Sequence, residues 1–421
     1  MRILFMANAP WAKTGYGIQG RHLTRGWRSL GHDVGYFSFY GVQGGSLTWD
    51  GITILPTGID PWGNDIIQAH CNSFKADVLI TLMDIWVQDH YGTLKNTVWA
   101  PWMPIDSQPV APAVADHMWG AKRVITYAKF GLEEARKVGV DADYIPHGVD
   151  TSVFHPGDQA AARKRIGLPE SGHITAIVAA NKGTRKALAE NINAWAAFHR
   201  EHPDSVLYLH TLMGAQHHGI DIPPLVRHLG VDKSVFYVDQ YRYVTGALES
   251  DYMASVYQAS DVLLAASTSE GFGVPILEAQ ACGVPAITTN FTSMPELTWF
   301  GATVEPAQLF WCPQNTWQAV PSMLGITKAL RVLYDMAPAE REQRRWHAIN
   351  TVAREYAWDI LIERYWEPFL EDLAAELKGD RPPKLAWPDR QAWQRHCYNI
   401  EEPEEAHEPV PDSGGAVVNA I

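Results

Sequence analysis

The sequence predicts an α/β protein with two domains, each built on a parallel β-sheet that helices cover on both faces. A chain of 421 residues, 46% of them hydrophobic, is long enough for two substantial cores. Its short apolar runs lack polar alternation, which is typical of strands buried on both faces. Helical stretches separate these runs, and that alternation predicts parallel sheets.

The first series of strands and helices predicts a domain over residues 1–160. Helices are expected near residues 17–30, 66–74 and 131–138, with a short one after the fifth strand. The predicted strands are RILFMAN, VGYFSFY, ITILPT, DVLITLMD, TVWAPWM, RVITYA and DYIPHG. The stretch that follows is rich in turn residues and predicts a hinge between domains.

The second series predicts a domain over residues 161–350. Its helices are expected at residues 187–200, at residues 248–258 and after Pro275, where proline suits a first helical position. Its strands are HITAIVAA, SVLYLHT, SVFYV, DVLLAA and AITT. Residues 351–379 show helical spacing, and the acidic, proline-bearing tail over 380–421 is predicted to be disordered.

Charge and composition limit the partners that the protein is expected to bind and the compartment in which it is expected to reside. The net charge of −13 disfavours a nucleic-acid partner, because phosphate backbones are bound by clustered Lys and Arg. At most a peripheral membrane contact is expected, since no run approaches the ~20 apolar residues of a span. The four scattered cysteines lack metal-ligand spacing and disulfide density, so we expect a cytoplasmic protein.

The stretch EGFGVPILEAQACGVPAI places Glu270 and Glu278 on either side of a loop that contains two glycines and a proline. A buried strand precedes this loop and a helix follows it. Such a loop lies at the carboxyl end of the strand and the amino end of the helix, where open α/β sheets bind ligands. The stretch therefore predicts a binding site.

This stretch resembles the Glu-x7-Glu motif of retaining glycosyltransferases of family 4, which have the GT-B fold. Three further pieces match in order: PWAKTGYGIQG, YIPHGVDTSVFHP and the basic NKGTRKA. The resemblance covers residues 1–370. It implies two facing Rossmann-like domains, with a last long helix that crosses back to the first one.

The resemblance also implies roles for the residues around the second sheet. Glu270, Arg185 and Lys186 form the expected catalytic set, in which the acid binds the transferred sugar and the cations stabilise the leaving pyrophosphate. Glu278 is expected to bind the ribose of the donor, and Lys182 to help bind the pyrophosphate. The other expected donor-binding residues are Gly271, Phe272, Gly273 and Val274, through their backbone N–H groups, and Tyr243 and Val244 near the base.

On the first domain the resemblance implies an acceptor side. Gly15, Tyr16 and Gly17 belong to the loop expected to close over the donor phosphates and position the acceptor. Many relatives carry a histidine after a late strand, whereas this chain has Ile105 and Asp106 there. Asp106 either contacts sugar or acceptor hydroxyls or caps the following helix.

The predicted function is transfer of a hexose, such as mannose or glucose, from a nucleoside-diphosphate sugar to an acceptor hydroxyl. The acceptor is a glycan, protein, lipid or small molecule. No cofactor and no metal are expected, and a GDP-sugar is favoured over a UDP-sugar. Three alternatives stay open. One is a non-catalytic GT-B protein that binds sugar nucleotide or glycan, and another is a nucleotide-sugar epimerase of the same architecture, which would convert donor without an acceptor. The third is a transferase whose acceptor is nucleic acid, which the acidic balance of the chain disfavours.

Overall fold

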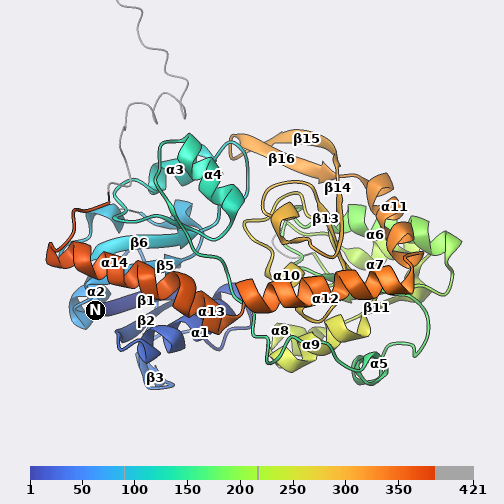
Figure 1. Ribbon diagram of the computed structural model, residues 1–421, viewed down its shortest axis with the longest axis horizontal. Helices are drawn as coiled ribbons and strands as arrows, with labels where there is room; N and C mark the ends of the chain where they lie inside the picture. The colour runs from blue at the N-terminus through green and yellow to red at the C-terminus, as the bar shows by residue number, and fades with distance from the viewer. Residues whose placement is uncertain (90, 216–217, 385–421) are drawn as a thin grey trace, which may run out of the picture.

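The computed structural model describes residues 1–384 except residue 90 and residues 216–217 (Figure 1). Most of the predicted tail, residues 385–421, lies outside the described residues. The described chain forms two α/β domains side by side, with the C-terminal helices running along both of them (Figure 1). The predicted fold class is confirmed.

The first sheet has eight strands in the order β3-β4-β2-β1-β5-β6-β7-β8, and all its pairs are parallel except β3 with β4. The strands are β1 (Arg2–Asn8), β2 (Asp33–Tyr40), β3 (Leu47–Trp49), β4 (Ile52–Leu55), β5 (Val78–Leu82), β6 (Val98–Met103), β7 (Ile125–Thr126) and β8 (Asp143–Tyr144). The helices between them are α1 (Gly15–Ser29), α2 (Ile67–Phe74), α3 (Pro112–His117) and α4 (Lys129–Lys137), with short 3-10 turns at Ile85–Val87 and Tyr91–Thr93.

The second sheet has six parallel strands in the order β11-β10-β9-β12-β13-β14. The strands are β9 (Ile174–Val178), β10 (Val206–His210), β11 (Val235–Tyr237), β12 (Val262–Ala265), β13 (Ala286–Thr289) and β14 (Gly301–Val304). Its helices are α5 (Gln159–Ile166), α6 (Leu188–Glu201), α7 (Ile222–His228), α8 (Gln240–Val244), α9 (Ser250–Ala259), α10 (Val274–Ala281) and α11 (Met323–Tyr334). Two further 3-10 turns lie at Asp232–Ser234 and Pro295–Leu297.

Alternate side chains of the central strands pack into different cores. Ile3 and Phe5 of β1 pack with Trp27 of α1 in one core, whereas Leu4 and Met6 pack against the helices of the opposite face. Burial on both faces explains the unbroken apolar runs in the sequence. Because parallel strands end at one edge of each sheet, their following loops gather there.

Several segments differ from the expectation: β3, β14, α7, α8, α11 and α12 (Pro338–Glu355) were not predicted, and two further segments are of another kind than expected. Part of the predicted hinge is a helix, α5, whose Arg163 donates to Asp261 and to the carbonyl of Ala259, so it packs on the second domain. A two-stranded antiparallel hairpin, β15 (Pro306–Cys312) and β16 (Thr316–Pro321), lies outside both parallel sheets and was not predicted. Neither segment carries a continuous buried apolar run, the pattern on which the prediction depended.

The C-terminal helices cross from the second domain to the first, as predicted. They comprise α12 (Pro338–Glu355), α13 (Trp358–Leu361), a π-helical turn at Ile362–Trp366 and α14 (Glu367–Lys378). Trp366, Phe369 and Leu370 are buried in the same core as Trp27 of α1. Among the described residues, no helix has both the length and the apolar character that crossing a bilayer requires.

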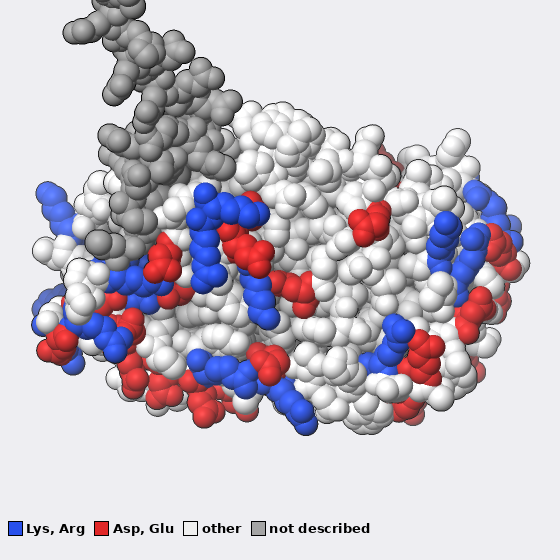
Figure 2. Space-filling view, turned by 45° about the horizontal axis from the view of Figure 1, so that its top comes forward, with Lys and Arg blue, Asp and Glu red and all other residues white. Residues whose placement is uncertain are grey.

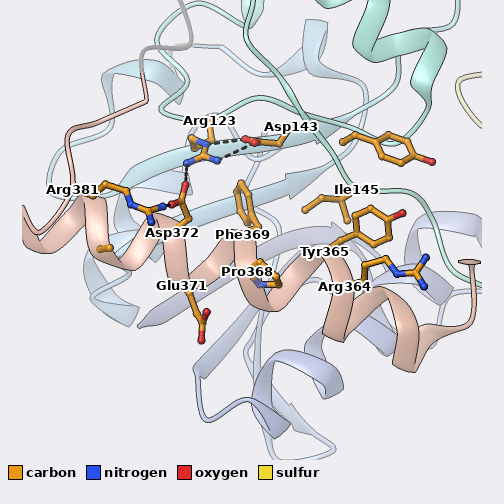
Figure 3. A pocket seen from close by; sticks show the side chains of 12 residues that line it. Arg123, Asp143, Ile145, Arg364, Tyr365, Pro368, Phe369, Glu371, Asp372 and Arg381 are labelled. Carbon is orange, nitrogen blue, oxygen red and sulfur yellow. Dashed lines mark hydrogen bonds and ion pairs between the residues drawn. The ribbon is translucent and has the colours of Figure 1, made fainter.

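A cavity of about 550 Å³ lies where α14 meets the first domain (Figure 3). Tyr144 and Ile145 of the first domain line it together with Tyr365 and Phe369 of the C-terminal helices. None of the predicted site residues is among those that line it. This cavity therefore belongs to the packing of the returning helix and not to the predicted binding site.

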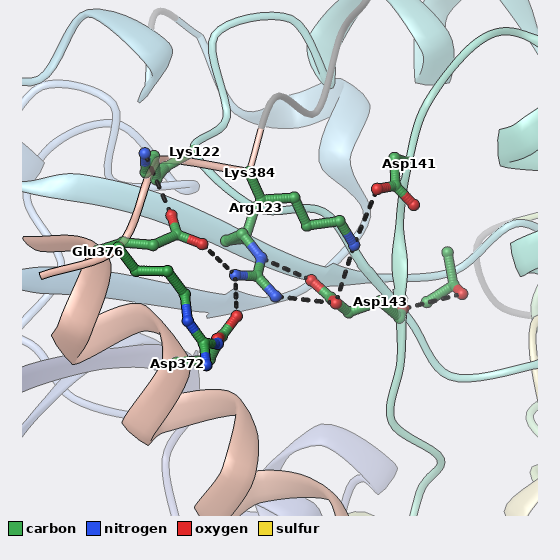
Figure 4. Close-up of polar contacts among 9 residues, drawn as sticks. Lys122, Arg123, Asp141, Asp143, Asp372, Glu376 and Lys384 are labelled. Carbon is green, nitrogen blue, oxygen red and sulfur yellow. Dashed lines mark hydrogen bonds and ion pairs between the residues drawn. The ribbon is translucent and has the colours of Figure 1, made fainter.

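Arg123 fixes α14 to the first domain (Figure 4). Its guanidinium, 4% exposed, donates twice to Asp143 at 2.8 and 2.9 Å. It also donates to Asp372 at 3.0 Å and Glu376 at 2.6 Å on α14, and Lys122 pairs with Glu376 at 3.2 Å. A buried cation with several hydrogen-bonded partners is costly to remove, because its partners are left with uncompensated charge.

We expect Arg123→Met to lower the free energy of unfolding by about 3–5 kcal/mol, the usual cost of breaking a buried ion pair. Chemical denaturation followed by circular dichroism measures the change. Arg331→Ala, which breaks an exposed pair with Glu201, is the control and should change stability little. Equal effects of the two substitutions would contradict a structural role for the Arg123 network.

Candidate active site

The candidate site lies at the carboxyl edge of the second sheet, where the loops after β9 and β12 meet. The loop after β9 carries Arg185 and Lys186, and the loop after β12 carries Glu270. The amide N–H of Thr268 donates to the carbonyl of Arg185 at 2.8 Å, which joins the two loops. Asn191 of α6 donates to the carbonyls of Lys186 and Ala266 and holds them in place.

Glu270 is the centre of an ion cluster. One carboxylate oxygen accepts from Arg185 Nη1 at 3.1 Å, and the other accepts from Lys186 Nζ and from the Ser267 hydroxyl at 2.6 Å. Burial alone would raise the pKa of Glu270, but the charges of Lys186 and Arg185 outweigh burial and hold this pKa at about 2. The structure thus brings the three predicted catalytic residues into direct contact.

Strained backbone supports this cluster from two sides. The Glu270 amide donates to the hydroxyl of Thr292 at 3.0 Å, and Thr292 has a φ of 53°, which is rare for a β-branched residue. Ala187, directly after Lys186, also has a positive φ of 45°. Such conformations persist only where the surrounding contacts impose them, and they occur often at functional sites.

Glu278 has a different environment from Glu270. It lies on α10, and its carboxylate accepts from the Tyr257 hydroxyl of α9 at 2.7 Å. Burial raises the pKa of Glu278 to about 7, while the Tyr257 hydrogen bond lowers it only partly. The two glutamates of one motif therefore differ strongly in how readily they ionise.

The glycine loop between the two glutamates touches the first domain. A Cβ atom on Gly271 would lie 2.7 Å from the Pro104 side chain and 3.3 Å from the Tyr127 ring, so only glycine permits this approach. The Phe272 ring is buried and packs edge-on against Tyr127 and His147. Gly273, with a φ of 108°, directly precedes α10, which begins at Val274.

The remaining predicted donor residues lie around this loop. Lys182 is exposed on the loop after β9 and, in the described structure, is not among the partners of Glu270. The Tyr243 ring lies 5.2 Å from His210 at the end of β10, whereas Val244 is 67% exposed on α8. Contacts of these residues with a donor stay a prediction.

The first domain faces the cluster with the loop after β1. Thr14 caps α1 by accepting the Gly17 N–H at 3.1 Å, and a Cβ atom on Gly17 would lie 2.6 Å from two carbonyl oxygens. Gly15 is exposed, and Tyr16 lies beside Tyr127. Burial, followed by the charge of Asp84, raises the pKa of Tyr16, and Arg185 of the second domain lowers it.

Asp84 was missed by the sequence analysis. It follows β5 and retains solvent access, yet the surrounding protein and the charge of Asp106 raise its pKa, while Arg185 and Lys182 lower it. The sequence signal was available, because an acid directly after a buried strand lies at the same sheet edge as the other site residues. Asp106 does not cap the next helix, since Ala111 occupies the cap position of α3.

The described residues hold no group of three or more His, Cys, Asp or Glu side chains arranged to bind a metal ion. The positive charges of the site come instead from Arg185 and Lys186.

Comparison with known proteins supports the resemblance found in the sequence. The family model of the group 1 glycosyl transferases matches residues 241–320, which include both motif glutamates. The D-inositol 3-phosphate glycosyltransferase of Segniliparus rotundus is 31% identical over 214 residues. The chain is thus similar to the group 1 glycosyl transferases over the part of the second domain that carries the motif. That match covers 49% of this chain and 44% of the Segniliparus protein, so the chain spans about half the length of such curated relatives.

Solved structures of this fold align along most of the chain. Sucrose-phosphate synthase from Thermosynechococcus elongatus gives a TM-score of 0.70 at 18% identity, covering 89% of this chain and 100% of that one. The Anabaena HepE protein, solved in complex with UDP and glucose, gives 0.67 at 14% identity, covering 88% and 100%. At these identities the likeness concerns the fold, and it confirms the GT-B architecture expected for the family.

Glu278 generates a prediction about stability and pH. The folded state holds the Glu278 proton more tightly than an unfolded chain, in which the pKa is near 4.5. Ionising Glu278 therefore costs folding free energy, and its contribution to stability falls as the pH rises from about 4.5 to about 7.

We expect Glu278→Gln, which keeps an acceptor for Tyr257, to gain stability relative to the native protein across this interval, by up to ~3 kcal/mol. Denaturant titrations at pH 5 and pH 8 measure the difference. Glu305→Gln, an exposed carboxylate that pairs with Asn290, is the control. A constant difference between native protein and Glu278→Gln at both pH values would show that Glu278 does not titrate in this range.

Proposed function

We propose that the protein is a retaining glycosyltransferase that moves a hexose from a nucleoside-diphosphate sugar to an acceptor hydroxyl without a metal ion. The observation that carries the proposal is the contact of Glu270 with Arg185 and Lys186 at the sheet edge. Glu278 lies on α10, the helix that follows the Glu270 loop. This arrangement offers acceptors for sugar hydroxyls and two cations for a diphosphate.

Names of relatives support a sugar nucleotide as the donor. The curated relatives are named as glycosyltransferases, and HepE was solved with UDP-glucose as well as with UDP and glucose. Whether the donor of this chain carries guanine or uracil stays a proposal, with GDP placed first and UDP second.

The proposed reaction needs no nucleophilic side chain. The acceptor oxygen forms a bond to the anomeric carbon on the face from which the diphosphate leaves, and the bond from that carbon to the phosphate oxygen breaks. The leaving phosphate takes the acceptor proton, so the products are the glycoside and a nucleoside diphosphate. Arg185 and Lys186 stabilise the charge that develops on the phosphate, and Glu270 orients the sugar.

The acceptor is proposed to be uncharged. Asp84 and Asp106 give the first-domain side of the site a negative character, and each contributes to the electrostatic surroundings of Arg185. A phosphorylated acceptor, such as the one named for the relatives, would meet these like charges, which disfavours its binding. A neutral polyol is not repelled by these carboxylates, and its hydroxyls can donate hydrogen bonds to them.

Thermal-shift measurement with GDP, UDP, ADP and CDP tests the donor class. We expect one nucleoside diphosphate to stabilise the protein in EDTA, because a ligand at ~100 times its Kd adds about 2.7 kcal/mol. The shift should disappear when Glu278 and Lys186 are both replaced by alanine. A flat response to all four nucleotides would contradict the sugar-nucleotide proposal, and a shift that required metal would contradict metal independence.

Lys186→Met should lower kcat by roughly 10²–10³-fold, the usual effect of removing one group that stabilises transition-state charge. The donor Kd should change much less, since the lost interaction strengthens as the bond breaks. Steady-state kinetics and calorimetry separate the two effects. Lys233→Met, on the surface turn before β11, is the matched control. A loss of activity that merely follows a loss of melting temperature would show that Lys186 is structural.

A further inference from the structure

The β15–β16 hairpin has an unusual composition for an exposed segment. Residues 306–321 read PAQLFWCPQNTWQAVP and contain no Lys, Arg, Asp or Glu. The hairpin instead carries two tryptophans, a leucine and three glutamines. Figure 2 brings this side of the molecule forward and shows a broad surface on which charged side chains are sparse.

The hairpin is fixed to both halves of the proposed active site. The Trp317 N–H donates to the Gln108 carbonyl at 3.1 Å, two residues after Asp106 on the acceptor side. The Ala319 N–H donates to the Thr268 carbonyl at 3.1 Å, two residues before Glu270. The outer edge of β16 therefore lies between the acceptor loop and the donor-sugar loop.

Two tryptophan rings of this hairpin are open to solvent. Trp311 is 51% exposed and Trp317 is 41% exposed, and Leu309 beside them is 45% exposed. The two rings pack edge to face across the strands, with their centroids 5.1 Å apart and an interplanar angle of 76°. Such a cross-strand pair stabilises a hairpin by only about 0.2–1 kcal/mol. The stability of the hairpin therefore does not explain why two large rings are exposed.

We propose that Trp311 and Trp317 form a subsite for the neutral glycan portion of the acceptor, an inference that rests on the proposed function. The C–H faces of a pyranose ring are apolar and pack against an aromatic ring, while its hydroxyls need donors and acceptors. The exposed amide of Gln314, in the turn between the two strands, provides both. Backbone hydrogen bonds of β16 join the hairpin to the loops on both sides of the reaction centre.

The absence of charge on the hairpin favours this occupant over others. An anionic membrane surface is bound by Lys and Arg, of which residues 306–321 contain none. A charged protein partner would be expected to meet complementary charges, which this segment also lacks. A neutral glycan needs neither.

Affinity electrophoresis of the full-length protein in native gels tests the subsite. The probes are dextran, glucomannan and galactan, each cast into the gel, with a gel without polysaccharide as reference. We expect at least one of them to slow the native protein, and Trp311→Ala with Trp317→Ala to raise the apparent Kd at least tenfold. Trp346→Ala, which removes a ring that is 50% exposed on α12, is the matched control and should migrate like the native protein.

Replacing both tryptophans by phenylalanine should restore part of the retardation, which a purely structural role of the rings would not predict. The subsite would be overturned if no polysaccharide slowed the native protein. Equal retardation of the native protein and the double alanine variant would overturn it too. Binding of the native protein to anionic vesicles that is lost in the double alanine variant would also overturn it, because the tryptophans would then bind a membrane surface. The nucleoside-diphosphate shift of the same variants reports the proposed function separately, and we expect it unchanged.

Discussion

The ion cluster of Glu270 with Arg185 and Lys186 is the constraint on which the site depends. Glu270 lies on a different crossover loop from the two cations, 85 residues after Arg185 and 84 residues after Lys186 in the chain. Two cations next to each other at a sheet edge repel, and the carboxylate between them offsets that repulsion. Removing Glu270 would leave two partly buried cations without their counter-charge, so the loop geometry and the charge of the site are inseparable.

The two motif glutamates differ in how readily they ionise because their surroundings differ. Glu270 stays ionised at any physiological pH, since its pKa is about 2. Glu278, with a pKa of about 7 and the Tyr257 hydroxyl as its partner, is divided between its two protonation states near neutrality. Hydrogen bonds donated to a carboxylate favour its charged form. In the proposed donor complex, ribose hydroxyls that donate to Glu278 would therefore release its proton.

The sequence predicted those features that depend on local patterns. Buried strands, the glycine loop, Glu270 and Glu278 follow from periodicity and from the order of strand, loop and helix. The supports of the site could not be predicted, because Tyr257 and Thr292 reach their partners from 21 and 22 residues away and carry no motif of their own. The hairpin lacked a buried apolar run, since its faces are largely exposed, and Asp84 was missed although it follows a predicted strand.

The two domains present side chains of opposite charge to the proposed site, and this difference assigns each proposed substrate to one domain. The second domain presents Arg185 and Lys186, which suit a diphosphate, whereas the first domain presents Asp84 and Asp106, which do not. The domains are joined near the site by ion pairing of Lys13 with Glu249 and by the β16 bonds to the acceptor loop. A donor is therefore expected to bind the second domain whichever acceptor is present. We therefore expect the acceptor to be selected by the acidic groups of the first domain and by the uncharged, aromatic β15–β16 hairpin.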